Sequence, residues 1–160
     1  RHTRLQGDWS SDVCSSDLIE VAEGVRIHDA ARGEAEVLRV PGLHAVSTVA
    51  TLFGGRAHAL VARVLSEQLL LVVRADRTLA QRIVLPAATR AVAFAEERGL
   101  AIALADERAV RIIDLRTGEL AGAWEAPQPL VAVAIDAGAR RVAYASIDDG
   151  DLAQIGRAHV

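Results

Sequence analysis

Short apolar runs separated by polar turns recur along most of the chain. Between residues 90 and 126 the runs "RAVAFAE", "GLAIALA", "AVRIIDL" and "ELAGAWEA" follow one another, each bounded by Gly, Asp or charged residues. Such runs are typical of short antiparallel strands joined by hairpins. The pattern therefore predicts four consecutive strands, which we name A to D. Helix is the competing interpretation for runs such as "AHALVARVL", because alanine and leucine favour helix.

The four-strand pattern repeats along the chain. "VRIHDAARGE" (residues 25–34) returns as "VRIIDLRTGE" (110–119) at an offset of 85, and "AVAF" returns as "AVAI" at an offset of 41. "RGLAIALAD" (98–106) returns as "RRVAYASID" (140–148) at an offset of 42. A period of about 40 to 45 residues is typical of four-stranded propeller blades. We therefore predict an all-β protein, an open arc of four-stranded antiparallel β-propeller blades that forms an incomplete propeller.

These copies divide the chain into parts of blades and whole blades. Strands C and D of one blade fall in 24–42, whole blades in 45–86 and 89–127, and strands A and B of a last blade in 130–153. In the first whole blade we expect strand A at 45–52, B at 57–65, C at 68–74 and D at 79–85.

The two ends of the chain lack this pattern. "DWSSDVCSSDL" (8–18) back-translates into one frame of a short-read sequencing adapter, and "IGRAHV" (155–160) back-translates into the opposite adapter. We therefore expect 1–18 to be translated adapter, non-native and disordered, 154–160 to be non-native as well, and 19–153 to be a fragment of a natural protein. The adapter would cut the last strand C. A natural Ser/Asp-rich linker is the alternative for the N-terminal stretch.

Composition narrows the possible functions. The net charge is −3, and the basic residues form no patch of the kind that binds nucleic acid. No apolar run approaches the roughly 18 residues that a membrane span needs. The single cysteine, Cys14, falls in the adapter match, so the natural segment has no disulfide framework or thiolate metal site. Because we expect the true N-terminus to be missing, localisation is unknown, and the cytoplasm is favoured only slightly.

We find no constellation of catalytic or ligand-binding residues. His28, His44 and His58 have no second ligand at metal-binding spacing. "FGGRAH" (53–58) lacks the spaced glycines and Lys-Ser/Thr of a phosphate loop, and "DDGD" (148–151) has too few oxygen ligands for calcium. The sequence therefore predicts no catalytic residue, no cofactor and no metal.

"VRIIDLRTGELAGAW" followed by "LVAVAIDAGARRVAYASIDDGDL" resembles the WD-repeat β-propeller pattern, in which strand C ends in Trp-Asp. The resemblance covers essentially all of 19–153. Ile113 and His28 replace the Trp, whereas Asp114 and Asp29 keep the Asp. The Gly-His that normally precedes strand A is absent. A more divergent quinoprotein-like or lactonase-like propeller is the alternative.

Several residues have expected roles in turns and strands. Aspartate can accept hydrogen bonds from turn amides, and glycine supplies the positive φ of a tight hairpin. The residues to which we assign such roles are Asp29, Gly33, Asp106, Asp114, Gly118, Asp148 and Gly150. Three prolines, Pro41, Pro86 and Pro127, each follow a strand D, where the missing N–H interrupts no ladder.

The resemblance implies a non-enzymatic scaffold that binds a protein or peptide of unknown identity. The alternative is a propeller enzyme or cofactor-linked sensor whose site lies in missing blades, because a propeller fold does not by itself fix function. We also expect the fragment alone to self-associate, since an open arc leaves blade faces and strand edges uncovered.

Overall fold

The computed structural model describes residues 16–21, 24–29, 33–148 and 151–159 of the 160-residue chain. Within these residues the regular secondary structure is almost entirely β-strand. The elements are β1 (Ser16–Val21), β2 (Gly24–Asp29), β3 (Glu34–Arg39), β4 (Leu43–Leu52), the 3-10 helix η1 (Phe53–Gly55), β5 (Ala57–Val64), β6 (Glu67–Arg74), β7 (Leu79–Val84), β8 (Ala91–Ala95), β9 (Leu100–Leu104), β10 (Ala109–Asp114), β11 (Leu120–Glu125), β12 (Leu130–Ile135), β13 (Arg141–Asp148) and β14 (Asp151–His159).

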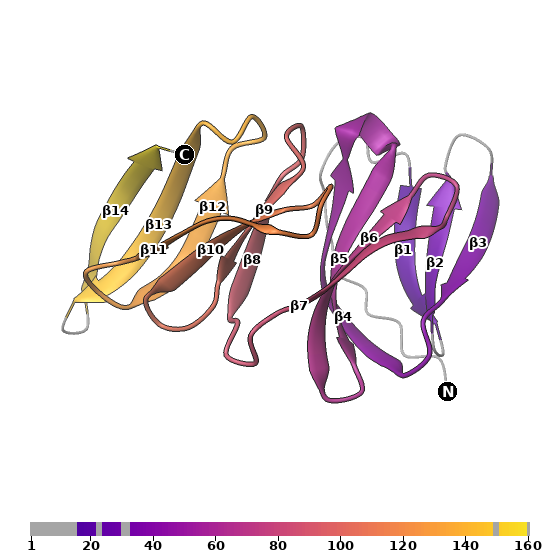
Figure 1. Cartoon of the computed structure of the whole chain (residues 1–160), viewed down its shortest axis with the longest axis horizontal. Coiled ribbons are helices and arrows are strands. Elements are labelled where there is room, and N and C mark those ends of the chain that lie inside the picture. The colour runs from indigo at the N-terminus through magenta and orange to yellow at the C-terminus, as the bar shows by residue number, and fades with distance from the viewer. Residues whose placement is uncertain (1–15, 22–23, 30–32, 149–150, 160) are drawn as a thin grey trace.

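The strands form four antiparallel sheets that stand side by side in chain order (Figure 1). The second and third sheets have four strands each, in the orders β4-β5-β6-β7 and β8-β9-β10-β11. The first and fourth sheets have three described strands, β1-β2-β3 and β12-β13-β14. The row does not close into a ring, which confirms the predicted all-β open arc of an incomplete propeller.

Every strand expected inside the repeats is present, with its ends within two residues of the predicted ones. The helical interpretation of "AHALVARVL" is wrong, because Ala57–Val64 forms β5. Seven of the eight residues of β5 are buried, so its sequence shows no apolar and polar alternation. A middle strand covered on both faces reads as a continuous apolar run, which periodicity alone does not distinguish from a buried helix.

A proline follows the last strand of each of the first three sheets at the same distance. Pro41, Pro86 and Pro127 each lie two residues after the end of β3, β7 and β11. At these points the chain leaves one sheet and crosses to the next, so the absent N–H removes no bond from a ladder. The linkers from strand D to strand A are therefore short and begin at equivalent places.

The two ends of the described chain correct the sequence-based expectation. Ser16–Val21 forms β1, which pairs with β2 from Ser16 opposite Asp29 to Val21 opposite Gly24. Expected disorder over 1–18 is thus wrong at 16–18, whereas 1–15 lie outside the described residues. The last strand C does not stop at 154, since β14 continues to His159 through the residues expected to be non-native. A ladder uses backbone groups alone, so a free sheet edge can pair with an extended chain of almost any sequence.

Three apolar clusters fill the spaces between neighbouring sheets. Between the first and second sheets Val25 and Ile27 of β2 join Leu60, Leu69 and Leu71 of β5 and β6. A second cluster joins the second sheet to the third, and a further one joins the third sheet to the fourth. Burying one such large side chain stabilises a fold by about 1.5 to 3 kcal/mol. Sheet-on-sheet contact is therefore the main source of stability.

The cross-strand register corrects one alignment between the repeats. Phe94 lies opposite Ala101 in the third sheet, and Ile135 lies opposite Val142 in the fourth. Both strands A and B thus correspond at an offset of 41, so the offset of 42 expected for strand B is wrong. Because side chains alternate between faces, a shift of one residue moves each side chain to the other face of its sheet.

Candidate functional site

Turns and linkers gather along two opposite edges of the row of sheets. One edge, which we call the turn edge, has the A–B and C–D turns, including 96–99 and 115–119. The other, which we call the linker edge, has the B–C turns and the D–A linkers. The described members of the linker edge are the turns at 65–66 and 105–108 and the linkers at 40–42, 85–90 and 126–129. Antiparallel pairing of successive strands produces this separation.

Two of the expected turn residues act together on the turn edge. Asp114 Oδ1 accepts a 2.8 Å hydrogen bond from the backbone N–H of Arg116. The N–H of Gly118 donates to the backbone carbonyl of Asp114 over 2.8 Å, and Gly118 has a φ of +78°. This geometry stabilises the hairpin between β10 and β11.

The other expected turn residues are spread over several hairpins. Gly33, with a φ of +66°, precedes β3. Asp29 is the last residue of β2 and lies opposite Ser16 and Glu34. Asp148 ends β13, opposite Asp151, and Gly150 lies outside the described residues.

Asp106 caps the B–C turn of the third sheet on the linker edge. Its Oδ1 accepts hydrogen bonds of 2.8 Å from the backbone N–H groups of Arg108 and Ala109. These two bonds favour the charged carboxylate and lower the pKa of Asp106. The turn therefore presents a negative charge at neutral pH.

An open hollow of about 450 Å³ lies beside this turn, lined by Asp106, Glu107, Arg108 and Glu125. Backbone bonds frame it: Ala126 N–H donates to the Arg108 carbonyl at 2.9 Å. The Arg108 Nε–H donates to the Ala126 carbonyl at 2.8 Å, which fixes the only cation of the lining. Three carboxylates against one guanidinium give the hollow a negative character, which the ion pair of Glu107 with Arg90 at 3.6 Å reduces.

The same edge exposes an apolar side chain on the neighbouring sheet. Leu65, in the two-residue B–C turn, is 73% exposed and has a φ of +55°. Its N–H donates to the carbonyl of Gly42 at 2.9 Å, so the linker before β4 supports the turn. A non-glycine residue with positive φ is uncommon and strained, and such strain is found at functional sites more often than elsewhere.

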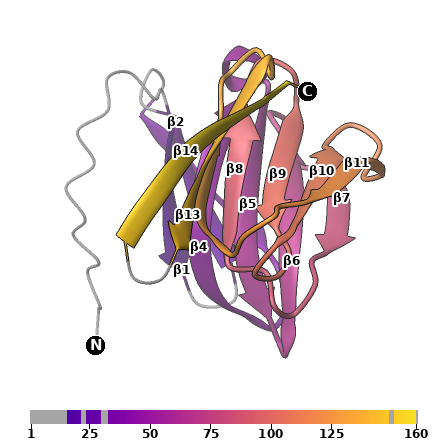
Figure 2. The same cartoon turned by 90° about the vertical axis from the view of Figure 1, so that its left-hand side faces the viewer.

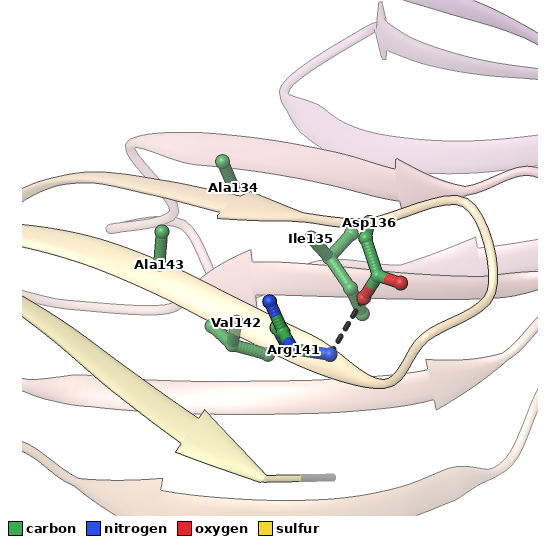
Figure 3. Close-up of a pocket in the computed structure, with 6 residues that line it drawn as sticks. All are labelled: Ala134, Ile135, Asp136, Arg141, Val142 and Ala143. Atoms are coloured by element: carbon green, nitrogen blue, oxygen red, sulfur yellow. Dashed lines mark hydrogen bonds between the residues drawn. The ribbon is translucent and has the colours of Figure 1, made fainter.

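A second hollow, of about 270 Å³, lies at the free end of the row, on β12 and β13 (Figure 3). It is lined by Ala134, Ile135, Asp136, Arg141, Val142 and Ala143. The Arg141 backbone N–H donates to Asp136 Oδ1 over 2.6 Å, which closes the hairpin. Apart from these two, the lining is apolar.

The three candidate histidines lie apart from both hollows. His28 is half-buried in β2, His44 is exposed in β4, and His58 is buried in β5. Within the described ranges, no group of three or more His, Cys, Asp or Glu residues could bind a metal ion. Those residues also include no helix long and apolar enough to cross a membrane.

Sequence reasoning missed both hollows and the role of Leu65. Hollows arise from the packing of separate repeats, which no single motif encodes. A signal for Leu65 did exist: "VLSE" leaves two residues between strands, and such turns need positive φ. A leucine at this position therefore marks a strained turn.

Comparison with known proteins identifies the fold. No family model and no curated protein sequence matches the chain. Among solved structures, a WD40 propeller chain in "Crystal Structure of Mitotic Checkpoint Complex" is similar, with a TM-score of 0.61 and 13% sequence identity. The match covers 80% of this chain and 39% of that chain. At this identity the similarity shows the fold alone, and the chain is an incomplete β-propeller similar to the WD40 type.

Proposed function

We propose that this protein is a non-enzymatic scaffold that binds a protein or peptide through its linker edge. The observation on which the proposal rests is the exposed, strained Leu65 on the same edge as the acidic hollow of the next sheet. The similar WD40 propeller chain belongs to a multi-protein complex, which agrees with a scaffold role. The comparison gives no support to the enzyme alternative. The proposal includes no cofactor, metal or nucleic acid.

The linker edge has the properties of a small binding surface. Backbone bonds fix its turns and linkers, so little conformational entropy is lost when a partner binds. Leu65 supplies an apolar anchor whose full burial is worth about 1.5 to 3 kcal/mol. Glu107 and Glu125 favour a Lys or Arg of the partner, which adds selectivity more than affinity. We therefore expect partners that present an apolar residue and a basic residue on one extended segment.

A random-peptide display selection on the full chain tests the proposal. Recovered peptides should bind with micromolar affinity and should lose at least tenfold in affinity against a Leu65→Ser, Glu107→Arg double variant. Both substitutions should weaken binding of the same peptide, because Leu65→Ser removes an apolar contact and Glu107→Arg reverses a charge. Affinity is measured by fluorescence anisotropy at two salt concentrations, because a charge contribution weakens with salt.

A matched variant on the turn edge serves as the control. Glu97→Arg reverses the same charge at an exposed residue between β8 and β9, and it should leave peptide affinity unchanged. Selected peptides that bind equally to the wild type and the double variant, or that lose affinity only with Glu97→Arg, would show that the linker edge is not the binding surface.

A further inference from the structure

Strand D of each sheet has one free edge, on the side away from strand C. The described strands D are β3, β7 and β11, and no other described strand pairs with their free edges. We call them the outer strands, and Figure 2, which views the row end-on, shows β7 and β11 together on one side of it. Each outer strand continues through a linker into the next sheet, so its free edge does not arise from the ends of the chain. Such an edge can accept an extended segment of another chain.

Two of the three outer strands contain a β-bulge at the same place. The ladder skips Ala80 in β7 and Ala121 in β11, so each alanine lies between paired residues without a partner of its own. The two alanines are 41 residues apart, which is the repeat distance of these two sheets. A bulge bends and twists the strand, and it is one of the devices by which proteins block unwanted pairing at a sheet edge. The free edges of β7 and β11 are therefore protected.

The outer strand of the first sheet has no bulge. β3 pairs with β2 without interruption, from Glu34 opposite Asp29 to Arg39 opposite Gly24. All six residues of β3 have a partner in this ladder. The free edge of β3 therefore has the regular spacing of backbone groups that a further strand needs.

The repeat in the sequence contains the same difference. Gly33 and Gly118, which precede the outer strands of the first and third sheets, are 85 residues apart. Pro41 and Pro127, which follow the same two strands, are 86 residues apart. The segment that contains β3 is thus one residue shorter than the segment that contains β11. The residue that is missing is the one that forms the bulge.

We propose that the free edge of β3 binds an extended segment of another protein, which adds to the first sheet as an antiparallel strand with basic residues opposite Glu34 and Glu36 and an acidic residue opposite Arg39. In strand addition the backbone hydrogen bonds supply affinity and the side chains supply selectivity. Opposite charges directly across a strand pair stabilise it, whereas like charges destabilise it. The two glutamates and the arginine of β3 therefore specify the order of charges in the partner.

Exposed apolar side chains near this edge favour apolar residues in the middle of the segment. Val37 of β3 is 38% exposed, and Val84 of β7 is 60% exposed. Val84 pairs with Leu69, and Leu69 belongs to the cluster against which Leu38 of β3 packs. Val84 thus lies on the face of the second sheet that is turned toward the first. Because neighbouring residues of a strand point to opposite faces, an added strand would bring one apolar side chain beside Val37 and the next toward Val84.

A second copy of β3 fits the charges of this edge only in part. In the antiparallel register that places Glu34 of one copy opposite Arg39 of the other, Glu36 lies opposite Val37 and has no opposite charge. A segment with two basic residues matches both glutamates. The site lies on the outer side of the row and not on the linker edge, so it goes beyond the proposed function and does not depend on it.

A fluorescently labelled peptide, Glu-Val-Val-Lys-Thr-Lys, is the probe. Antiparallel to β3, it places its glutamate opposite Arg39 and its two lysines opposite Glu36 and Glu34. Fluorescence anisotropy should show binding to the full 160-residue chain. Insertion of one alanine between Ala35 and Glu36 supplies the bulge that β7 and β11 contain, and it should weaken binding at least tenfold. The fold of the other two sheets accommodates the same bulge, and circular dichroism checks that the variant is folded.

Charge reversal tests the register of the added strand. Glu34→Lys should weaken binding about fivefold, because it places two positive charges opposite each other. A peptide with glutamate in place of its last lysine should bind this variant with the original affinity. Glu119→Lys is the matched control: Glu119 is exposed, lies 85 residues after Glu34 and precedes the bulged strand β11, so the substitution should leave the affinity unchanged.

Recovery of affinity with the charge-reversed peptide decides the matter even where the alanine insertion disturbs the first sheet. Absence of binding, or binding that the alanine insertion leaves unchanged in a folded variant, would overturn the proposal. Equal losses with Glu34→Lys and Glu119→Lys would overturn the location. A dimer of the chain that Glu34→Lys dissociates would assign the edge to a second copy and would also overturn the proposal.

Discussion

At the residue scale, Thr89 differs from the residues that take its place in the other linkers. Its N–H donates to the Pro86 carbonyl, as the N–H of Leu43 donates to the Val40 carbonyl in the linker before β4. At the offset of 41 the corresponding residue of the next linker is Leu130. Both leucines are buried, and Thr89 is buried as well, but its Oγ1 has no hydrogen-bond partner. A hydroxyl therefore lies in a position suited to an apolar side chain.

We expect Thr89→Val to raise the free energy of unfolding by about 1 kcal/mol, because it removes the desolvation cost of an unpaired hydroxyl at nearly constant volume. Urea unfolding followed by circular dichroism measures the change. Thr78→Val is the control: its exposed Oγ1 donates to Asp76 Oδ1 over 2.6 Å, so the substitution should give no gain. A destabilised Thr89→Val protein would mean that the hydroxyl has a stabilising partner.

His58 should make stability depend on pH. Burial disfavours the imidazolium and lowers the pKa of His58 below its ordinary value of 6.5. The unfolded chain then binds a proton more readily than the folded chain as pH falls below 6.5. The free energy of unfolding should therefore decrease from pH 6.5 toward the lower pKa of the folded state, and His58 should add no further loss below it.

Urea unfolding of the wild type and of His58→Gln between pH 5 and pH 8 tests this dependence. Glutamine does not titrate in this range, so the variant should show a smaller decrease below pH 6.5. His44→Gln, at an exposed histidine, is the control for the substitution itself. Parallel profiles of the wild type and His58→Gln would assign the pH dependence to other groups.

At the scale of the elements, an aromatic contact at the turn edge links the second sheet to the third. Phe53 precedes β5, and its ring packs against Gly99, between β8 and β9. The guanidinium carbon of Arg116 lies 4.9 Å from the centre of the same ring. Cation–π attraction of this kind contributes about 0.5 to 1 kcal/mol at exposed sites. The glycine is required because a Cβ at residue 99 would overlap the ring.

Gly99→Ala should destabilise the fold more than Gly33→Ala, although both glycines have a φ of +66°. Each substitution introduces strain of about 1 to 2 kcal/mol from positive φ. Only Gly99→Ala also displaces Phe53, since a Cβ at Gly33 meets open space. The added overpacking cost is about 1 to 3 kcal/mol. Thermal unfolding of both variants isolates this difference, and equal losses would show that the ring moves freely.

The strands were predictable because hairpin punctuation and the repeat agree with each other. The face on which each side chain lies was harder to predict, as the strand B alignment at an offset of 42 shows: similar residues at Arg98 and Arg140 favoured a register that the turn length does not permit. β1, which contains the apolar Leu18, Ile19 and Val21, and the C-terminal part of β14 were not predicted, because their residues lie in or beside the adapter matches and not in a recognisable repeat. Contacts between repeats, such as Phe53 with Gly99, are encoded by no single motif.

At the scale of the whole molecule, the two end sheets have edges of different kinds. β1 is the edge strand of the first sheet where a strand A would pair, and β14 is the edge strand of the fourth where a strand D would pair. Among the residues that the structure describes, neither edge has a further strand, and free edges of this kind can pair with another chain. The molecule thus combines well-packed central sheets with two end sheets whose edge strands can pair with another chain.

We expect the chain to self-associate as its concentration rises, through pairing at β14. Size-exclusion chromatography with light scattering at low and high concentration measures this. Neighbouring residues of a strand point their N–H groups to opposite sides, so Ile155→Pro and Gly156→Pro remove N–H groups from opposite edges of β14. One of the two variants should therefore block the free edge and reduce association. A monomer at all concentrations, or association that neither proline changes, would contradict edge pairing.

The hydrogen bonds between successive A–B turns have a consequence for how such proteins evolve. They join the Phe53 amide to the Glu96 carbonyl and the Glu97 amide to the Ala137 carbonyl, so the bonds themselves involve no side chain, although positive-φ positions such as Gly99 still restrict parts of the turns. A gene duplication that inserts one more period of about 42 residues therefore brings its own connection to its neighbours. Blade number can change in a single genetic step, while the side chains on each face adjust to their new neighbours afterwards.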